Sequence, residues 1–236
     1  MTDRRTRRLG AASSSPMIYH LPSYVSFGML GDRAVALDLR ADRYYLVAAA
    51  EAAALRAAGT EPMKPEMATR LEALTRRRLL GIGTGPAIKP VTAGSLRHSA
   101  LEAEADGDRV PWPEIALFRA DASVCLRLLG LRRTLGRWRT LRRRYERRTP
   151  PDSPERAAIR TAQGFAAARL LLPAKSLCVP DSLTLARILW RRGIDADVFF
   201  GVRLAPFLAH AWVQRGDMLL SDTLNTVGEY TPVFRL

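Results

Sequence analysis

The 236-residue chain has little cysteine and histidine and almost no lysine. Its two cysteines, Cys125 and Cys178, are too few for a disulfide framework, and no CxxC motif or cysteine and histidine cluster is present to hold zinc. A GxxxxGK[ST] phosphate-binding loop is also missing. We therefore expect a reducing, cytoplasmic location, with no metal and no other cofactor.

Long apolar runs are missing as well. No stretch reaches the roughly 18 consecutive apolar residues that a membrane helix requires, and no apolar segment follows the charged residues 1–8. The net charge of +14 and the pI near 11.0 favour an anionic partner. However, the chain has three lysines against 34 arginines, a bias that codon composition alone can produce. We expect neither a membrane span nor a nucleic-acid partner.

Apolar residues make up 47% of the chain, enough for real cores, and their pattern predicts two α+β units. Residues 1–16 have no hydrophobic period and are interpreted as a flexible basic tail. Residues 17–84 form the first predicted domain, residues 85–111 a linker rich in glycine, proline and acidic residues, and residues 112–236 the second domain.

The first domain is predicted to be a three-stranded sheet followed by helices. The runs YVSFGML, AVALDL and RYYLV between residues 24 and 47 are rich in strand-forming residues, and their alternation predicts one buried face. An alanine-rich helix over 48–58 is stopped by Gly59, and a second helix begins near Pro65 and ends at Gly81.

The second domain is predicted to begin with helices and to end with strands. An apolar stripe with spacings of three and four predicts the first helix; it consists of Ile115, Phe118, Ala122, Cys125 and Leu129. An arginine-rich helical pattern follows over 132–148, most simply a solvated face, and further helices are expected over 154–172 and 180–192. The runs DVFFGV, HAWVQ and MLLSD are the three strand candidates that close the chain.

Cys178 has the sequence context of a nucleophile. It lies just before Pro180, which suits the first turn of a helix, so its thiol faces free backbone N–H groups that favour the thiolate. Cys125 lies on an apolar stripe and is interpreted as a small buried hydrophobe. His20 and His98 lie in a strand lead-in and in the linker, where solvated or capping roles are expected.

His210 and Asp222 supply the base and its partner in this hypothesis. His210 begins a strand that holds the imidazole rigidly, and Asp222 ends the next strand, close enough in a hairpin to accept a hydrogen bond from the ring. The alternative for Asp222 is that it simply begins a turn. The predicted catalytic set is Cys178, His210 and Asp222.

The C-terminal half resembles the lasso-peptide leader peptidases, which are transglutaminase-like or papain-like cysteine peptidases. The resemblance covers LPAKSLCVPDSLTLARILWRRGIDADVFFGVRLAPFLAHAWVQRGDMLLSD, with His210 32 residues after Cys178 and Asp222 12 residues after His210. The chain departs from the family at Asp181, where a basic residue is frequent. An acidic side chain there is expected to make the thiolate harder to form.

The N-terminal unit resembles the RiPP recognition element, a small winged-helix-like domain. The resemblance rests on Leu37-Asp38-Leu39, on the run Arg43, Tyr44, Tyr45 and Leu46, and on the helices that follow. It implies that a leader peptide adds a strand to the sheet edge at these four residues. The alternative is that Tyr44 and Tyr45 merely pack a small core.

Together the resemblances imply a leader peptidase of lasso-peptide biosynthesis. It would bind the leader of a ribosomally made precursor and hydrolyse the leader–core bond, and a separate asparagine-synthetase-like cyclase would use ATP on the freed core. The arginine-rich helix would be one place for contact with that cyclase. Two alternatives remain: a transglutaminase-type acyl transferase that uses the same triad, and a non-catalytic winged-helix protein that binds nucleic acid.

Overall fold

The computed structural model describes residues 18–58, 65–104, 110–172 and 177–236. The tail predicted over 1–16 and the stop predicted at Gly59 lie outside these ranges. The elements of the first part are β1 Tyr19–His20, β2 Val25–Leu30, β3 Arg33–Asp38, β4 Arg43–Val47, α1 Ala49–Ala57, α2 Pro65–Arg76 and β5 Gly81–Ile82. The later elements are β6 His98–Ser99, the 3-10 helix η1 Ala100–Glu102, α3 Trp112–Tyr145, α4 Pro154–Leu170, α5 Cys178–Arg191, β7 Asp197–Leu204, β8 Phe207–Arg215, β9 Met218–Leu219, α6 Leu224–Val227 and β10 Thr231–Arg235.

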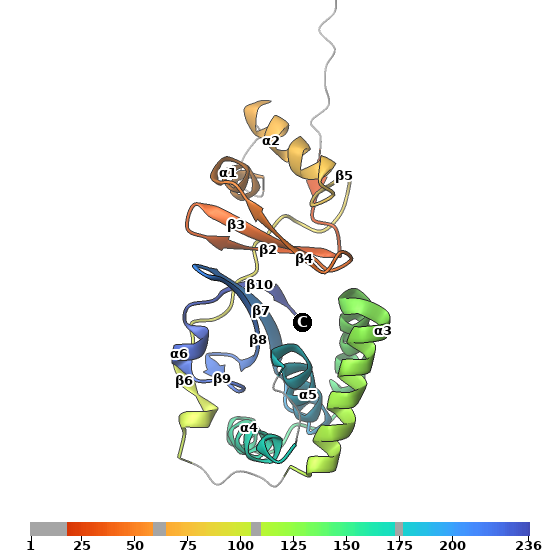
Figure 1. The fold of residues 1–236 in the computed structure, drawn as a ribbon, viewed down its shortest axis with the longest axis vertical. Coiled ribbons are helices and arrows are strands. Elements are labelled where there is room, and N and C mark those ends of the chain that lie inside the picture. The colour runs from red at the N-terminus through yellow and green to blue at the C-terminus, as the bar shows by residue number, and fades with distance from the viewer. Residues whose placement is uncertain (1–17, 59–64, 105–109, 173–176) are drawn as a thin grey trace, which may run out of the picture.

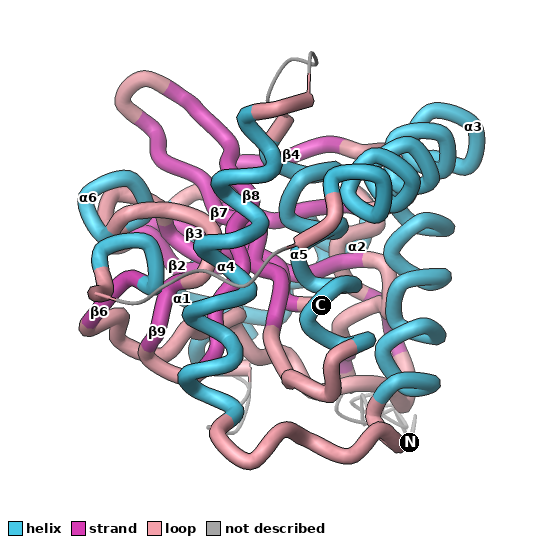
Figure 2. Tube along the Cα trace, turned by 90° about the horizontal axis from the view of Figure 1, so that it is seen from below, coloured by secondary structure: helices cyan, strands magenta, loops and turns pink. Residues whose placement is uncertain are grey.

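Two sheets stack between two layers of helices (Figure 1). Strands β2, β3 and β4 form an antiparallel meander, with α1 and α2 above it in the figure. The second sheet has the order β10-β7-β8-β9-β6, antiparallel except where β6 pairs with β9. In Figure 2, α3 runs along one side of the molecule and α6 lies on the opposite side. The α+β architecture predicted from the sequence is found.

The predicted meander is found, and its middle strand is buried on a second face that the alternation did not indicate. Val25 and Phe27 share one face with Ala34 and Ala36, and this face packs beneath the helices. The opposite face of β3 belongs to the core of the C-terminal half and consists of Val35, Leu37 and Leu39. Strand β3 is therefore buried on both faces, because β10 packs against β2 and β3.

Gly28 on β2 explains how closely the two sheets approach each other. A Cβ at this position would overlap the backbone carbonyl oxygen of Pro232 on β10. Any larger residue would push the sheets apart, since a backbone carbonyl cannot move out of the way as a side chain can.

The segment over 85–111, predicted as a linker, contains regular structure. Strand β6 extends the second sheet at its β9 edge, and η1 packs against α4. The amide of Gln163 on α4 donates to the carbonyls of Ala100 and Ala103. This segment therefore contributes to the second domain, although its composition is that of a loop.

The other differences have local causes. The second helix ends at Arg76 rather than at Gly81, and Gly81 pairs with His20 in a two-stranded sheet instead. Leu129 is 42% exposed although it lies on the predicted stripe. The reason is Gly130, whose φ of 74° and ψ of 172° kink α3 and start a new stripe. Strands β6 and β10 were not predicted.

Candidate active site

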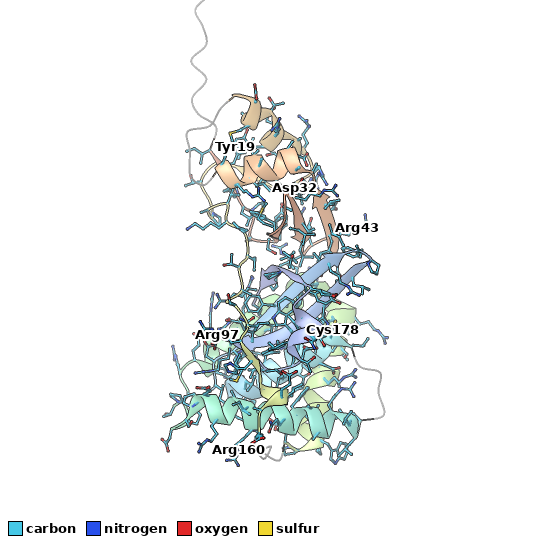
Figure 3. All side chains as sticks on the ribbon, turned by 90° about the vertical axis from the view of Figure 1, so that its left-hand side faces the viewer. Tyr19, Asp32, Arg43, Arg97, Arg160 and Cys178 are labelled. Carbon is cyan, nitrogen blue, oxygen red and sulfur yellow. The ribbon has the colours of Figure 1, made fainter. Side chains whose placement is uncertain are left out.

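A cavity of about 430 Å³ lies between α4, α5 and strand β8. Its polar wall brings together Cys178 on α5, His210 on β8 and Asp222, which follows β9. Its apolar wall comes from α4 and η1 and consists of Leu101, Ala162, Phe165 and Ala166. Figure 3 shows Cys178 within the C-terminal half, beneath the first sheet.

Helix α5 begins at Cys178, so the thiol lies where backbone N–H groups have no partner in the helix. Leu177 is the N-cap in extended conformation, and its N–H donates to Asp181 Oδ2 at 3.0 Å. The helix is anchored on the sheet because the Ser182 hydroxyl donates to the carbonyl of Ala211 at 2.9 Å. Pro180 is buried in the first turn.

His210 and Asp222 are in direct contact. The distance from His210 Nε2 to Asp222 Oδ1 is 3.0 Å, which leaves Nδ1 as the ring nitrogen available to the thiol. The imidazole also has two aromatic neighbours: its centroid is 6.5 Å from that of Trp212 and 5.4 Å from that of Tyr230. Packing against these rings helps to position the imidazole.

Two serines hold the aspartate in place. Ser221 donates to Asp222 Oδ2 at 2.5 Å and accepts from the backbone N–H of Val213 at 2.9 Å. Ser99, at the end of β6, donates to the backbone carbonyl of Asp222 at 2.6 Å. Asp222 is thus tied to β8 and to the segment predicted as a linker. Neither serine was singled out from the sequence, because no motif marks a residue that supports another.

The pKa of Cys178 is lowered from 9.0, against the effect of burial. Burial is the largest influence and raises it, but hydrogen bonds from His210 and from the backbone N–H groups of Ala211 and Val179, with the charge of His210, outweigh it. Burial also lowers the pKa of His210, yet hydrogen bonds and charges from Asp222 and Cys178 raise it to about 9. The site therefore favours a thiolate beside an imidazolium.

Asp181 does not have the effect expected from the sequence. Its Oδ1 accepts from Arg119 Nε at 2.6 Å and from Arg169 Nε at 3.1 Å, so two largely buried guanidinium groups balance its charge. Asp181 is not among the causes that shift the pKa of Cys178. The two guanidinium groups thus offset the expected penalty for the thiolate, and Arg119 lies 62 residues from Asp181 in sequence.

The four predicted leader-binding residues lie on β4, an edge strand of its sheet among the residues described. Tyr44 faces the C-terminal half, where its ring meets that of Phe207 with centroids 5.7 Å apart. Tyr45 faces the helices and lies beneath the guanidinium of Arg77. Arg43 and Leu46 are exposed. The two tyrosines therefore belong to different cores.

The remaining cysteine and histidines lie outside the site. Cys125 is buried on α3, with Arg137 Nη1 at 3.3 Å and Asp121 Oδ1 at 3.6 Å from its sulfur. His20 contacts the Gly83 carbonyl, and His98 is exposed on β6. Within the described ranges no group of three or more histidine, cysteine, aspartate or glutamate side chains is arranged to hold a metal. No helix there is long and apolar enough to cross a membrane.

Comparison with known proteins places this geometry in a family context. The chain is similar to the microcin J25-processing protein McjB of Escherichia coli, with 45% identity over 51 residues, 22% of this chain and 24% of that protein. The match thus spans about a quarter of the relative's length. No solved structure matches. Residues 122–235, the greater part of the C-terminal half, match the model of the transglutaminase-like superfamily.

Proposed function

We propose that this protein is a cysteine peptidase that removes the leader from a lasso-peptide precursor. The observation that carries the proposal is the cavity in which a thiol at a helix N-terminus meets an imidazole that is hydrogen-bonded to a carboxylate. The match to the transglutaminase-like superfamily and the similarity to a protein described as processing microcin J25 support this reading.

In this mechanism Cys178 is the nucleophile. Its thiolate attacks the carbonyl carbon of the scissile bond, and the amine of the core peptide leaves with a proton from His210. Water, deprotonated by His210, then attacks the thioester and releases the leader as a carboxylic acid. Asp222 stabilises the imidazolium through its contact with Nε2, which keeps Nδ1 directed at the thiol.

Backbone groups are proposed to stabilise the tetrahedral intermediate. The N–H group of Cys178 lies at the first position of α5, where the helix supplies no acceptor for it. Donors held by a helix do not need to reorganise as negative charge develops on the carbonyl oxygen. We assign the oxyanion site to this turn.

Residues 17–84 are proposed to act as a RiPP recognition element with a winged-helix-like fold. The leader would add a strand to the free edge of β4, at Arg43, Tyr44, Tyr45 and Leu46. Binding at this edge raises the effective concentration of the scissile bond near Cys178. The released core would pass to an asparagine-synthetase-like cyclase in the cytoplasm.

Intact-mass spectrometry tests this function. The precursor encoded nearest the gene is incubated with the wild type, with Cys178→Ala and with Cys125→Ala, each with and without the neighbouring cyclase. We expect leader and core fragments from the wild type and from Cys125→Ala, and an intact precursor with Cys178→Ala. An intact precursor with every protein would contradict the proposal.

Acyl transfer on the same three residues is a second candidate, favoured by the match to the transglutaminase-like superfamily. In that reaction an amine, instead of water, resolves the thioester on Cys178. The same spectra separate the two. Hydrolysis gives fragments whose summed mass exceeds that of the precursor by one water, and amine transfer gives a product joined to the acceptor.

A further inference from the structure

Alternate side chains of the edge strand β4 face the half of the molecule that contains the active site. In the register of the meander, Tyr44 pairs with Leu37 and Leu46 pairs with Val35, so Tyr44 and Leu46 lie on the face that meets the C-terminal half. Tyr44 is partly buried there. Leu46, two residues further on the same face, is 47% exposed.

Tyr44 is close to the catalytic cavity. Its ring packs edge-on against Phe207 at an interplanar angle of 64°, and Phe207 lies three residues before His210 on β8. Tyr44 and Cys178 also pack against the same core cluster. Burial, followed by the charges of Asp42 and Cys178, raises the pKa of Tyr44 to about 12. The phenol and the thiol are thus electrostatic neighbours.

Large apolar side chains at the start of β8 and just before α5 remain open to solvent. Phe207, whose ring meets that of Tyr44, is 51% exposed. Leu177, next to Cys178, is 47% exposed. Tyr44, Leu46, Leu177 and Phe207 together are called the Tyr44 surface below. Figure 3 shows Arg43, at the start of β4, and Cys178 on the same side of the molecule, with the blue strands of the second sheet between them.

We propose that the Tyr44 surface binds the junction segment of the substrate, the extended stretch between the leader strand on β4 and the scissile bond at Cys178, through apolar side chains of that stretch. The proposal rests on the proposed function and deepens it. Tyr44 acts as a positioning residue, since its ring supports Phe207 and links the edge strand to the cavity.

The direction of the strands supports binding of the junction segment at the Tyr44 surface. A leader strand that pairs antiparallel with β4 runs from Val47 toward Arg43, so its C-terminal end leaves the sheet on the Tyr44 side. The scissile bond is C-terminal to the leader, and the thiol lies beyond that same end. An extended peptide that alternates apolar and polar side chains would place the apolar ones on the exposed leucines and Phe207.

Peptide binding in the inactive Cys178→Ala background tests the proposal independently of cleavage. Two fluorescent peptides are compared by anisotropy: the full leader with the first core residues, and the leader without its last residues before the cleavage site. We expect the full peptide to bind about tenfold more tightly, because burial of one or two large apolar side chains is worth about that factor. Equal affinity for the two peptides would overturn the proposal.

Substitutions then locate the contact. Leu177→Ser and Phe207→Ser change exposed side chains, so folding is preserved, and each is expected to weaken binding of the full peptide by about tenfold while the shorter peptide binds as before. The matched control is Leu128→Ser on α3, at a leucine 73% exposed outside this surface, with no expected change. Unchanged affinity of the full peptide for both surface variants would refute the assignment.

Tyr44 is tested in the active enzyme. Tyr44→Ala is expected to lower kcat/KM for the precursor by about tenfold, mainly through KM, and Tyr44→Phe is expected to restore it because the ring against Phe207 is kept. If the wild type cleaves the precursor and the surface variants cleave it equally well, the proposed role of the Tyr44 surface is contradicted, whereas the proposed peptidase function is not. Failure of the wild type to cleave would instead contradict the proposed function alone.

Discussion

The two cysteines have similar charged neighbours and opposite properties. Beside Cys178, Asp181 accepts from Arg119 and Arg169; beside Cys125, Asp121 accepts from Arg137 and Arg187. Yet the pKa of Cys178 is lowered from 9.0 and that of Cys125 is raised from it. Each cysteine therefore lies near one carboxylate that is paired with two guanidinium groups.

Helix position and the histidine make the difference. Cys125 lies in the middle of α3, where burial raises the pKa of its thiol more than Arg137 lowers it, and Asp121 adds a further increase. Cys178 lies at the first position of α5, and it also has His210. Both thiols lie near a paired carboxylate and a hydrogen-bond donor; the charged imidazole and the two backbone N–H groups at Cys178 are what lower the pKa of that thiol.

Removal of each sulfur should give the largest contrast. Cys178→Ala is expected to lower kcat for leader removal by about 10⁴-fold or more, since it removes the thiol that is hydrogen-bonded to His210. Cys125→Ala should keep kcat within about threefold and lower the free energy of unfolding by about 1 kcal/mol. Steady-state kinetics and urea unfolding measure both. Comparable losses of kcat in the two variants would contradict the distinction between a catalytic Cys178 and a structural Cys125.

The second prediction concerns the support of His210. Asp222→Asn is expected to lower kcat by about 10²–10³-fold, because a neutral amide stabilises an imidazolium at Nε2 much less than a carboxylate does. Ser221→Ala, which loses the donor to Asp222 Oδ2, should lower kcat about tenfold. Folding of both is checked by circular dichroism. Full activity of Asp222→Asn would show that Asp222 only begins a turn.

Cys178 should be alkylated about 100-fold faster than Cys125 at pH 7, because alkylation rates follow the thiolate fraction and the exposure of the sulfur. Cys178 should react with iodoacetamide well below pH 9, and mapped peptides would identify it.

For kcat/KM we expect a bell-shaped pH profile. Its acid limb reflects protonation of the thiolate at a pKa below 9.0, and its alkaline limb reflects loss of the imidazolium proton near pH 9.

Substitutions of the two aspartates are expected to act mainly on the stability of the fold. Asp181→Asn leaves Arg119 and Arg169 facing each other without their carboxylate and weakens the bond to the Leu177 N–H, so the free energy of unfolding should fall by about 2–3 kcal/mol. Asp121→Asn should lower the free energy of unfolding by only about 1 kcal/mol, because Arg137 is 47% exposed and solvent screens its ion pair with Asp121.

Alkylation of the aspartate variants sharpens the contrast further. Asp121→Asn, in the Cys178→Ala background, should speed alkylation of Cys125, since Asp121 raises its pKa. Asp181→Asn should leave the alkylation rate of Cys178 within about threefold of the wild type, because Asp181 does not shift its pKa. A large change at Cys178 would show that the carboxylate acts on the thiol after all.

Local chemistry made much of this site predictable. Pro180 just after a cysteine indicates a helix N-terminus, and the alternation around His210 indicates a strand, so both side chains were placed on the correct elements. The contact between His210 and Asp222 follows from a short hairpin. The three residues lie together as the sequence suggested, and their catalytic roles stay predictions.

Long-range packing accounts for what the sequence did not predict. Nothing local tells that Arg119 and Arg169 neutralise Asp181, that Ser99 holds Asp222, or that β10 covers the second face of β3. Gly28 lies inside an otherwise ordinary strand pattern, and only the position of Pro232 explains it. Contacts between distant segments carry no periodic signal, whereas helices and strands do.

Leader removal in water enriched in heavy oxygen tests the central claim most directly. The wild type and the precursor are incubated, and the masses of all fragments are recorded beside a Cys178→Ala control. We predict a leader fragment with one heavy oxygen in its new carboxylate, an unlabelled core with a free amine, and no cleavage by the variant. Cleavage by Cys178→Ala, or an intact precursor with the wild type in the presence of the cyclase, would contradict the account.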